Sequence, residues 1–378
     1  MARKSLNPRR PASFCFRFPL DLLGEVLARL PVKTLLKFRC VCKEWRSLID
    51  STSFASLHFA LYNSNPQNAR LFLIEGHRCR RRLCLIRRTD TFRKTCAVDL
   101  PTNYGHLWPF GYVNGWVCCT MYDNHDGRVL GFVMWNPSTR KSIEIPPPSG
   151  SHHIDGIRVV VVAPASGGAN DYKLVVIPFD HPSWNQCPIP PKVQNVPSSV
   201  LVEVYSLSTG CWRSAGVDTQ CVKSLIVTNT TTAVLNEAVH WIWKADQPTV
   251  DPLIIAFNVQ NDVLRHFCLP DGQRFQYSAI LSVLNESLVL SKSEQGFCLI
   301  WVMKEYGVAE SWVNCFKIDM NYGRFLYLQG NGRLFFTMEK QGVKVYDVES
   351  QEIEELARSY NGHIFFVDTF VETLALLP

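Results

Sequence analysis

The stretch FPLDLLGEVLARLPVKTLLKFRCVCKEWRSLIDSTSF, residues 18–54, has apolar residues at the spacing of short helices. Pro19 and Asp21 favour a helix start, because proline lacks only an N–H that the first turn leaves unbonded and an acidic side chain meets the positive end of the helix dipole. Pro31 ends this helix, since its ring biases the preceding residue away from helical backbone angles. The apolar residues that share the spacing are Leu22, Leu23, Val26, Leu27 and Leu30 in the first helix, Leu35, Leu36 and Phe38 in the second, and Trp45, Leu48 and Ile49 in the third. We therefore predict a module of three short helices.

This helical module carries more large apolar side chains than three short helices can bury, because a domain so small has little interior. Part of the apolar stripe is therefore expected to face a partner. The alternative is that these residues pack on the domain that follows in the chain. The stretch itself does not decide between a partner and an internal contact.

After Ala69 the sequence changes to short apolar runs separated by Gly, Asn, Asp and Pro, the pattern of strands and turns. One unit recurs, in which an apolar strand ends in an aromatic residue and a turn, and another strand follows. With the strands that precede them, units of about 45 residues match the four-stranded blades of a β-propeller. The run HPSWNQCPIPPKVQNVPSS, residues 181–199, predicts a surface loop, because prolines cannot continue a central strand. The aromatic landmarks of the five units are Trp135, Tyr205, Phe257, Trp301 and Tyr346.

A sixth blade is predicted from the two ends of the β-rich region. Its strands are ARLFLIE (69–75), RRLCLIRR (81–88), TCAVDLP (95–101) and the C-terminal VDTFVETLALLP (367–378). Pairing the first and last of these strands closes the ring and removes an exposed sheet edge. We therefore expect about six blades, closed by the C-terminal strand.

Residues 18–54 resemble the F-box, above all its plant form, in the RLPVK turn, the FRCVCK segment and the tryptophan that follows. Two departures are Phe18, which replaces a usual leucine, and Gly24 within the first helix, where glycine costs about 1 kcal/mol relative to alanine. The β-rich region resembles the F-box-associated domain of plant F-box proteins, similar to kelch propellers. Its shared strings are NGWVCC, WNPSTRK, DYKLVVI, EVYSLSTGCWR, AVHWIWK and IWVMKEYGVAESWVNCFKI. Glu237 stands where glycine is usual after Asn236, so this turn is expected to be of another type.

These resemblances imply a multidomain α+β chain, with a three-helix F-box module at residues 14–58 and an all-β propeller at residues 69–378. Residues 1–13, which precede them, are expected to form a basic disordered tail. They further imply that the module docks on a Skp-type adaptor, which binds a cullin. Carried over by position, the expected adaptor contacts are Pro19, Leu22, Leu23, Val26, Leu27, Leu30, Pro31, Leu35, Leu36, Val41, Cys42 and Trp45.

The same resemblance implies a role in recognition rather than catalysis. The chain is expected to be the substrate-recognition subunit of a Skp-cullin-F-box ubiquitin ligase, holding a target protein for ubiquitination and proteasomal degradation. Such a subunit acts by proximity, because it raises the effective concentration of a substrate lysine near the charged ubiquitin carrier. Candidate substrate-binding loops are residues 122–128, 181–199 and 245–251.

Charge is concentrated near the N-terminus, where residues 1–100 hold 20 Lys and Arg against 7 Asp and Glu. The densest basic run, residues 77–94, is typical of a nucleic-acid surface or of a solvated strand. Leu83, Leu85 and Ile86 favour the strand, with arginines alternating outward. Two alternatives to the ligase subunit therefore remain: a nucleic-acid-binding surface, and a propeller interaction module that acts outside a ligase.

Other functional classes lack a sequence signature. The sequence has no apolar run near the roughly 18 residues that span a bilayer, and its scattered cysteines lack zinc-finger spacing. We therefore expect reduced thiols, no membrane contact, and a location in the cytoplasm, the nucleus or both. Neither a GxSxG nucleophile elbow nor a phosphate-binding glycine loop occurs. His152 and His153 fit a solvated loop better than a metal site, and Cys40 and Cys42 fit apolar packing, so no enzyme activity, metal or cofactor is expected.

Overall fold

The computed structural model describes the chain in fourteen segments, and every structural statement below concerns these residues. They are residues 19–76, 83–101, 106–123, 129–148, 156–164, 172–179, 199–218, 226–227, 233–244, 251–270, 279–321, 323–338, 342–357 and 363–374. The tail predicted at residues 1–13 lies outside them. Among the described residues, no helix has the length and apolar content that crossing a membrane requires.

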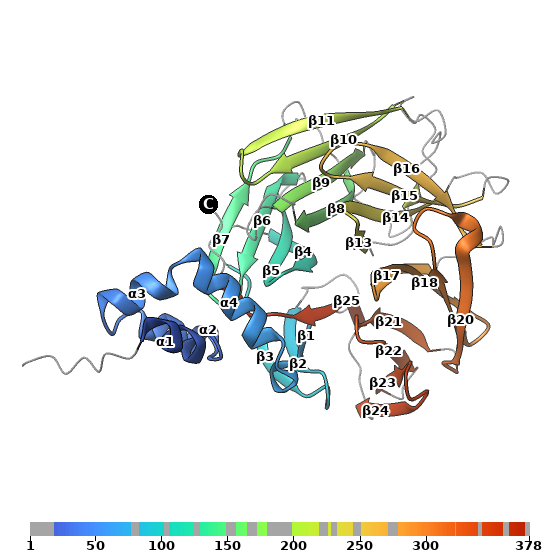
Figure 1. Cartoon of the computed structure of the whole chain (residues 1–378). Helices are drawn as coiled ribbons and strands as arrows, with labels where there is room; N and C mark the ends of the chain where they lie inside the picture. The colour runs from blue at the N-terminus through green and yellow to red at the C-terminus, as the bar shows by residue number, and fades with distance from the viewer. Residues whose placement is uncertain are drawn as a thin grey trace, which may run out of the picture.

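The N-terminal part is a module of helices, the helical module, which lies at one side of a ring of sheets (Figure 1). The three predicted helices are present, and a fourth follows them: α1 (Leu20–Leu27), α2 (Val32–Phe38), α3 (Lys43–Ile49) and α4 (Thr52–Asn63). Pro19 and Pro31 occupy the positions before α1 and α2, as expected from their fixed backbone angle. Ser51 caps α4, because its Oγ accepts a hydrogen bond from the Phe54 N–H at 3.2 Å.

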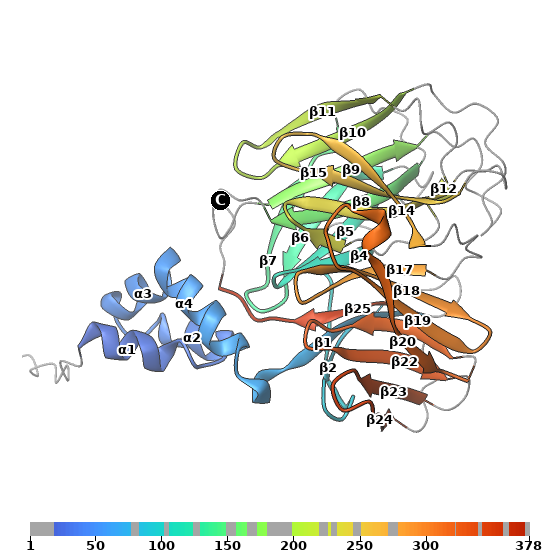
Figure 2. The same ribbon diagram turned by 45° about the vertical axis from the view of Figure 1, so that its right-hand side comes forward.

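The β-rich part forms six antiparallel sheets arranged as the blades of a propeller, which confirms the expected fold (Figures 1 and 2). Short helical turns precede β1 and β20: η1 (Pro66–Asn68) and η4 (Ala309–Ser311). The blade after the closing one contains β4 (His106–Val113), β5 (Trp116–Tyr122), β6 (Val129–Asn136) and β7 (Lys141–Ile145). The next contains β8 (Gly156–Pro164), β9 (Tyr172–Phe179), β10 (Ser199–Ser206) and β11 (Cys211–Asp218).

Three further blades complete the series. In the first, two short strands share the inner position: β12 (Ile226–Val227) and β13 (Ala233–Leu235) both pair with β14 (Ala238–Lys244), and β15 (Leu253–Asn258) and β16 (Leu264–Cys268) follow. The second contains β17 (Ala279–Leu284), β18 (Ser287–Glu294), β19 (Phe297–Met303) and β20 (Trp312–Asp319). The third contains β21 (Arg324–Leu328), β22 (Arg333–Met338), β23 (Gly342–Asp347) and β24 (Ile353–Ala357).

The closing blade joins the two ends of the propeller, as the sequence predicts. It has the strand order β25 (His363–Phe370), β1 (Arg70–Gly76), β2 (Leu83–Arg88) and β3 (Lys94–Val98). β25 pairs antiparallel with β1, with Leu73 opposite Val367. The C-terminal strand ends at Phe370, earlier than expected, because residues 371–374 leave the sheet and contact the helical module.

The cores of the propeller lie between neighbouring blades. Phe72 of the closing blade packs in one cluster with Val117, Val133 and Trp135 of the next blade. Trp241 and Trp312 are also buried, so these aromatic residues are core. Contacts between inner strands run from β13 through β17, β21, β25 and β4 to β8, which places these strands around the axis of the ring.

The turn at Asn236 and Glu237 differs from the sequence-based expectation of another turn type. Both residues have positive φ, 51° and 60°, as a type I′ turn requires of its central pair. Asn285 and Glu286 repeat this geometry, with φ of 47° and 57°. Two propeller hairpins therefore place glutamate where glycine is usual without changing the turn.

Candidate functional site

The helical module exposes apolar side chains that its own core does not use. Leu22 and Val26 are 53% and 58% exposed and lie one turn apart on the same face of α1. Val41, between α2 and α3, is 60% exposed. Pro19 and Pro31 are exposed at the starts of α1 and α2. We call these five residues the apolar face.

The other seven residues expected to contact the adaptor lie deeper. Leu27 and Leu35 are 2% and 0% exposed and belong to the core of the module. In the chain by itself they shape the helices, and their contact with an adaptor stays a prediction. The remaining five are partly exposed: Cys42, and four residues that pack at the edge of that core, Leu23, Leu30, Leu36 and Trp45.

Polar and aromatic contacts hold α2 against α3 and so fix the position of the connection that carries Val41. The Arg39 guanidinium lies 2.6 Å from an Asp50 carboxylate oxygen. The rings of Phe38 and Trp45 meet edge to face, with centroids 5.3 Å apart. Cys42 caps α3, since its Sγ accepts a hydrogen bond from the Trp45 N–H at 3.5 Å. The expected packing role of Cys42 therefore includes a cap.

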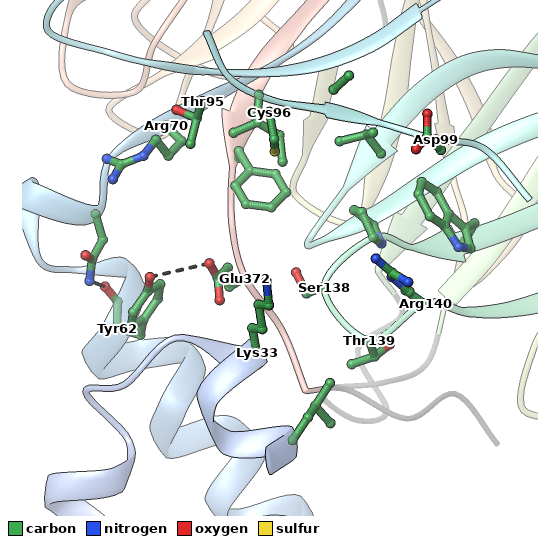
Figure 3. Close-up of a pocket in the computed structure, with 18 of the residues that line it drawn as sticks. Lys33, Tyr62, Arg70, Thr95, Cys96, Asp99, Ser138, Thr139, Arg140 and Glu372 are labelled. Carbon is green, nitrogen blue, oxygen red and sulfur yellow. Dashed lines mark hydrogen bonds between the residues drawn. The ribbon is translucent and has the colours of Figure 1, made fainter. Parts of the chain in front are cut away.

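A second feature is the C-terminal segment of residues 371–374, here called the C-terminal tie, which joins the helical module to the propeller. The Glu372 carboxylate accepts a hydrogen bond from the Val32 N–H at 2.7 Å. It also accepts one from the Tyr62 hydroxyl at 3.4 Å (Figure 3). Asn63 donates to the Glu372 carbonyl at 3.1 Å and accepts from its N–H at 3.0 Å. Leu374 is buried in the core of the helical module.

The propeller holds the other side of the C-terminal tie. The Tyr112 hydroxyl donates to the Val371 carbonyl at 2.8 Å and accepts from its N–H at 2.9 Å. The buried Asn136 side chain donates to the Thr373 carbonyl at 3.1 Å. At Gly115, a Cβ atom would lie 2.3 Å from the Thr373 Cγ2, so the close approach needs glycine. The tie is therefore contacted from both domains along its whole length.

Burial shifts the pKa values of carboxyl groups near the tie. Burial raises the pKa of Glu372, although hydrogen bonds from Val32 and Tyr62 oppose the shift. Four residues earlier, on β25, burial raises the pKa of Asp368 to about 6. Asp368 accepts hydrogen bonds from the Tyr327 hydroxyl at 3.0 Å and from the Thr369 N–H at 2.6 Å. These contacts link the inner strands β21 and β25.

The buried histidines of the described chain have structural partners. His240 contacts the Ala233 carbonyl at 3.1 Å and the Tyr306 hydroxyl at 2.7 Å, and burial lowers its pKa to about 4. The His58 ring lies 3.0 Å from the Leu30 carbonyl and stacks on Tyr62. Within the described segments, no three His, Cys, Asp or Glu side chains are grouped to hold a metal. His152 and His153 lie outside these segments.

Two arginines in the described part of the basic run, Arg87 and Arg88, form ion pairs. The Arg87 guanidinium lies 3.2 Å from a Glu75 carboxylate oxygen and stacks over the Phe92 ring. Arg88 pairs with Asp90 at 2.8 Å. The Arg88 side chain is 42% exposed, as the solvated-strand interpretation predicts, whereas the Arg87 side chain is 15% exposed and lies mostly buried beside Glu75. Residues 77–82, and nearly all of the loops at residues 122–128, 181–199 and 245–251, lie outside the described residues.

Comparisons with known proteins agree with this architecture. The F-box domain model matches residues 15–57, and the model of the F-box associated beta propeller domain matches residues 110–369. The chain belongs to the F-box-associated β-propeller family. F-box protein At5g49610 of Arabidopsis thaliana is 26% identical over 362 residues, which cover 90% of each chain. Putative F-box/kelch-repeat protein At1g15680 of the same plant is 30% identical over 59% of this chain and 52% of its own.

Proteins of the F-box-associated β-propeller family are generally adaptors without catalytic activity, and F-box domains generally bind Skp adaptors. The helical module is the F-box in this chain, and it carries the exposed apolar face. The sequence did not identify the C-terminal tie, because its partners Tyr62, Tyr112 and Asn136 are far from it in the chain. One signal was present: Glu372 interrupts the apolar run VETLALL.

Proposed function

We propose that this chain is the substrate-recognition subunit of a Skp-cullin-F-box ubiquitin ligase. The observation that carries the proposal is the apolar face on a family-matched F-box, attached to a closed propeller. An exposed apolar helix face beside a folded core is typical of a partner-binding surface. The F-box binds a Skp-type adaptor and through it a cullin, while the propeller binds a target protein.

The chain contributes position rather than a catalytic group. Holding a target near the charged ubiquitin carrier raises the effective concentration of the reacting lysine. The C-terminal tie supports this role, since it fixes the F-box against the propeller by hydrogen bonds on both sides. Target ubiquitination then leads to degradation. The free cysteines of the described chain support a cytoplasmic or nuclear location.

The test is co-purification of the full chain with a Skp-type adaptor, comparing Val26→Asp with Ile353→Asp. Val26 is 58% exposed on the apolar face, and Ile353 is 49% exposed on the propeller strand β24. A buried, unpaired charge at the adaptor interface should weaken binding by at least about tenfold. Ile353→Asp should bind like the wild type. Leu27 is unsuitable for this test, because a charge in the module core would unfold it.

Absence of adaptor binding by the folded wild type overturns the proposal. Equal binding by Val26→Asp and the wild type overturns the assignment of the apolar face. Circular dichroism of each variant distinguishes a lost interface from a lost fold, since Val26 and Ile353 are both surface residues.

A further inference from the structure

A cavity of about 880 Å³ lies where the F-box meets the propeller (Figure 3). The F-box contributes α2 and α4 to its wall, and the propeller contributes strand β3 and the turn between β6 and β7. Apolar side chains of the two adjacent blades, Ile86, Trp135 and Phe370, form part of its lining. The volume is within the range of about 300–1,000 Å³ that is typical of ligand sites.

The β3 strand meets this cavity along its edge. Five consecutive residues, Thr95 to Asp99, line the cavity. Because neighbouring side chains on a strand point to opposite faces, a cavity that contacts Cys96, Ala97 and Val98 of β3 must reach the edge between the faces. β3 is the last strand of its sheet, so in the described structure the backbone groups on its outer edge have no strand partner.

β3 is a short edge strand of five residues that begins with Lys94, and its pairing with β2 shifts register between Ile86 and Arg87, but the residues after Lys94 leave its outer edge open. Residues Lys94 to Ala97 are all exposed, and Thr95, Cys96, Ala97 and Val98 carry neither charge nor proline. Its free cysteine is consistent with an open rather than a covered edge. An edge of this kind accepts an extended peptide, whose backbone continues the hydrogen-bond ladder of the sheet.

The charges around the cavity favour an acidic occupant. Lys33 on α2 and Arg140 in the β6–β7 turn extend toward the cavity from the F-box and the propeller respectively (Figure 3). Neither side chain has an ion-pair or hydrogen-bond partner among the described residues. Two acidic residues line the cavity, Glu372 and Asp99. Glu372 already accepts hydrogen bonds from Val32 and Tyr62, so Asp99 is the one acidic lining residue that could offset the charges of Lys33 and Arg140.

We propose that an extended acidic peptide binds in this cavity, adding as a strand to the outer edge of β3 with its carboxylates facing Lys33 and Arg140. The chain's own residues 1–18 do not suit the site, because they contain five Lys and Arg and no Asp or Glu. A second copy does not suit it either, since it would bring a second Lys33 and Arg140 into the same space. That this peptide belongs to a ligase target rests on the proposed function. That it binds in the cavity does not depend on that function.

The first experiment selects a random eight-residue peptide library on the full chain, without any ligase component. Enriched peptides should be acidic, with β-branched residues between the acids. A labelled enriched peptide then measures affinity by fluorescence anisotropy. Two N-methylated versions of this peptide are then compared, one methylated at its odd positions and one at its even positions. One version should lose binding and the other should keep it, because only every second peptide N–H faces β3.

Variants of the full chain test the charge contacts. Lys33→Glu and Arg140→Glu should each weaken the acidic peptide at least about tenfold, because like charges replace attraction at the interface. Lys37→Glu is the matched control, since Lys37 is exposed on the same helix but does not line the cavity. Its affinity should equal that of the wild type.

The proposal is overturned if the selection enriches no acidic peptides, or if Lys33→Glu, Arg140→Glu and Lys37→Glu bind the peptide with equal affinity. It is also overturned if neither N-methylated version of the peptide loses binding. Dimers of the free chain that dissociate on Ala97→Asp would also overturn it in favour of a second copy at β3. Adaptor co-purification, measured separately, shows whether the proposed ligase function holds, so the two proposals fail independently.

Discussion

Buried carboxyl groups near the C-terminus show how single residues set the pH response of this chain. A carboxyl group taken out of water favours its neutral form, so its pKa rises. Asp368 contacts Tyr327 of the neighbouring inner strand, and Glu372 contacts two helices of the F-box. Both groups therefore connect elements that are distant in the sequence. Because the pKa values of both are raised in the folded chain, their protonation favours the folded state over the unfolded state.

Asp368→Asn should flatten the pH dependence of stability. The folded pKa of about 6 lies above the usual 3.8, so the folded state binds the proton more tightly than the unfolded state. This stabilisation is complete below about pH 4 and is lost as pH rises through about 6. The wild type should lose between about 1 and 3 kcal/mol of unfolding free energy over this window. Urea unfolding of both proteins from pH 4 to 7 measures the difference, and superimposable profiles would contradict it.

Truncation to alanine should lower the free energy of unfolding strongly at one residue of α1 and hardly at all at its neighbour. Leu27 is 2% exposed, so Leu27→Ala removes core contacts and leaves a cavity, which should cost about 2–4 kcal/mol of unfolding free energy. Val26 is 58% exposed, so Val26→Ala should stay within about 0.5 kcal/mol of the wild type. Chemical denaturation followed by circular dichroism compares them. Similar costs at the two positions would contradict the assignment of Leu27 to the buried side and Val26 to the exposed side of α1.

At the scale of elements, the C-terminal tie determines how the F-box sits on the propeller. Residues 371–374 of the tie belong to neither a strand nor a helix, so no sheet or helix ladder bonds their backbone. Its backbone is instead bonded by Asn63 on α4, Tyr112 on β4 and Asn136 on β6. Polar side chains thus supply the hydrogen bonds that a buried backbone segment needs.

Truncation after Phe370 should therefore uncouple the two domains while leaving β25 in the closing blade. We expect calorimetry to show one thermal transition for the wild type and two for the truncated chain, because the F-box loses Leu374 from its core and Glu372 from α2. Truncation after Leu374 is the control, since it keeps every described contact of the tie. Two transitions in the control, or one in both, would argue against the role of the tie.

At the scale of the whole molecule, the pairing of β25 with β1 is the step that closes the ring. A propeller without it would expose the edges of both strands. Residues 1–362 alone should therefore be insoluble or aggregate. Adding a synthetic peptide of residues 363–374 during refolding should restore a soluble monomer, as size-exclusion chromatography would show. A soluble, monomeric fragment without the peptide would contradict this view of closure.

Local patterns predicted the helices and blades well. Periodicity located α1 to α3, and the repeat of aromatic strand ends located the blades. The sequence also predicted closure, because both ends of the β-rich region have strand patterns and only one blade lacked strands. It could not predict the C-terminal tie or the cavity beside β3. Those features depend on how Glu372, Asn63 and Lys33 meet in space, and no local periodicity encodes such contacts.

The most direct test of the central claim is a hydrogen-exchange footprint of a Skp-type adaptor on the full chain. We predict slower exchange in peptides that contain the apolar face, around residues 19–31 and Val41, with unchanged exchange in the propeller strands. Protection confined to the propeller, or no protection at saturating adaptor, would contradict the claim that this chain is a ligase subunit that docks through its F-box.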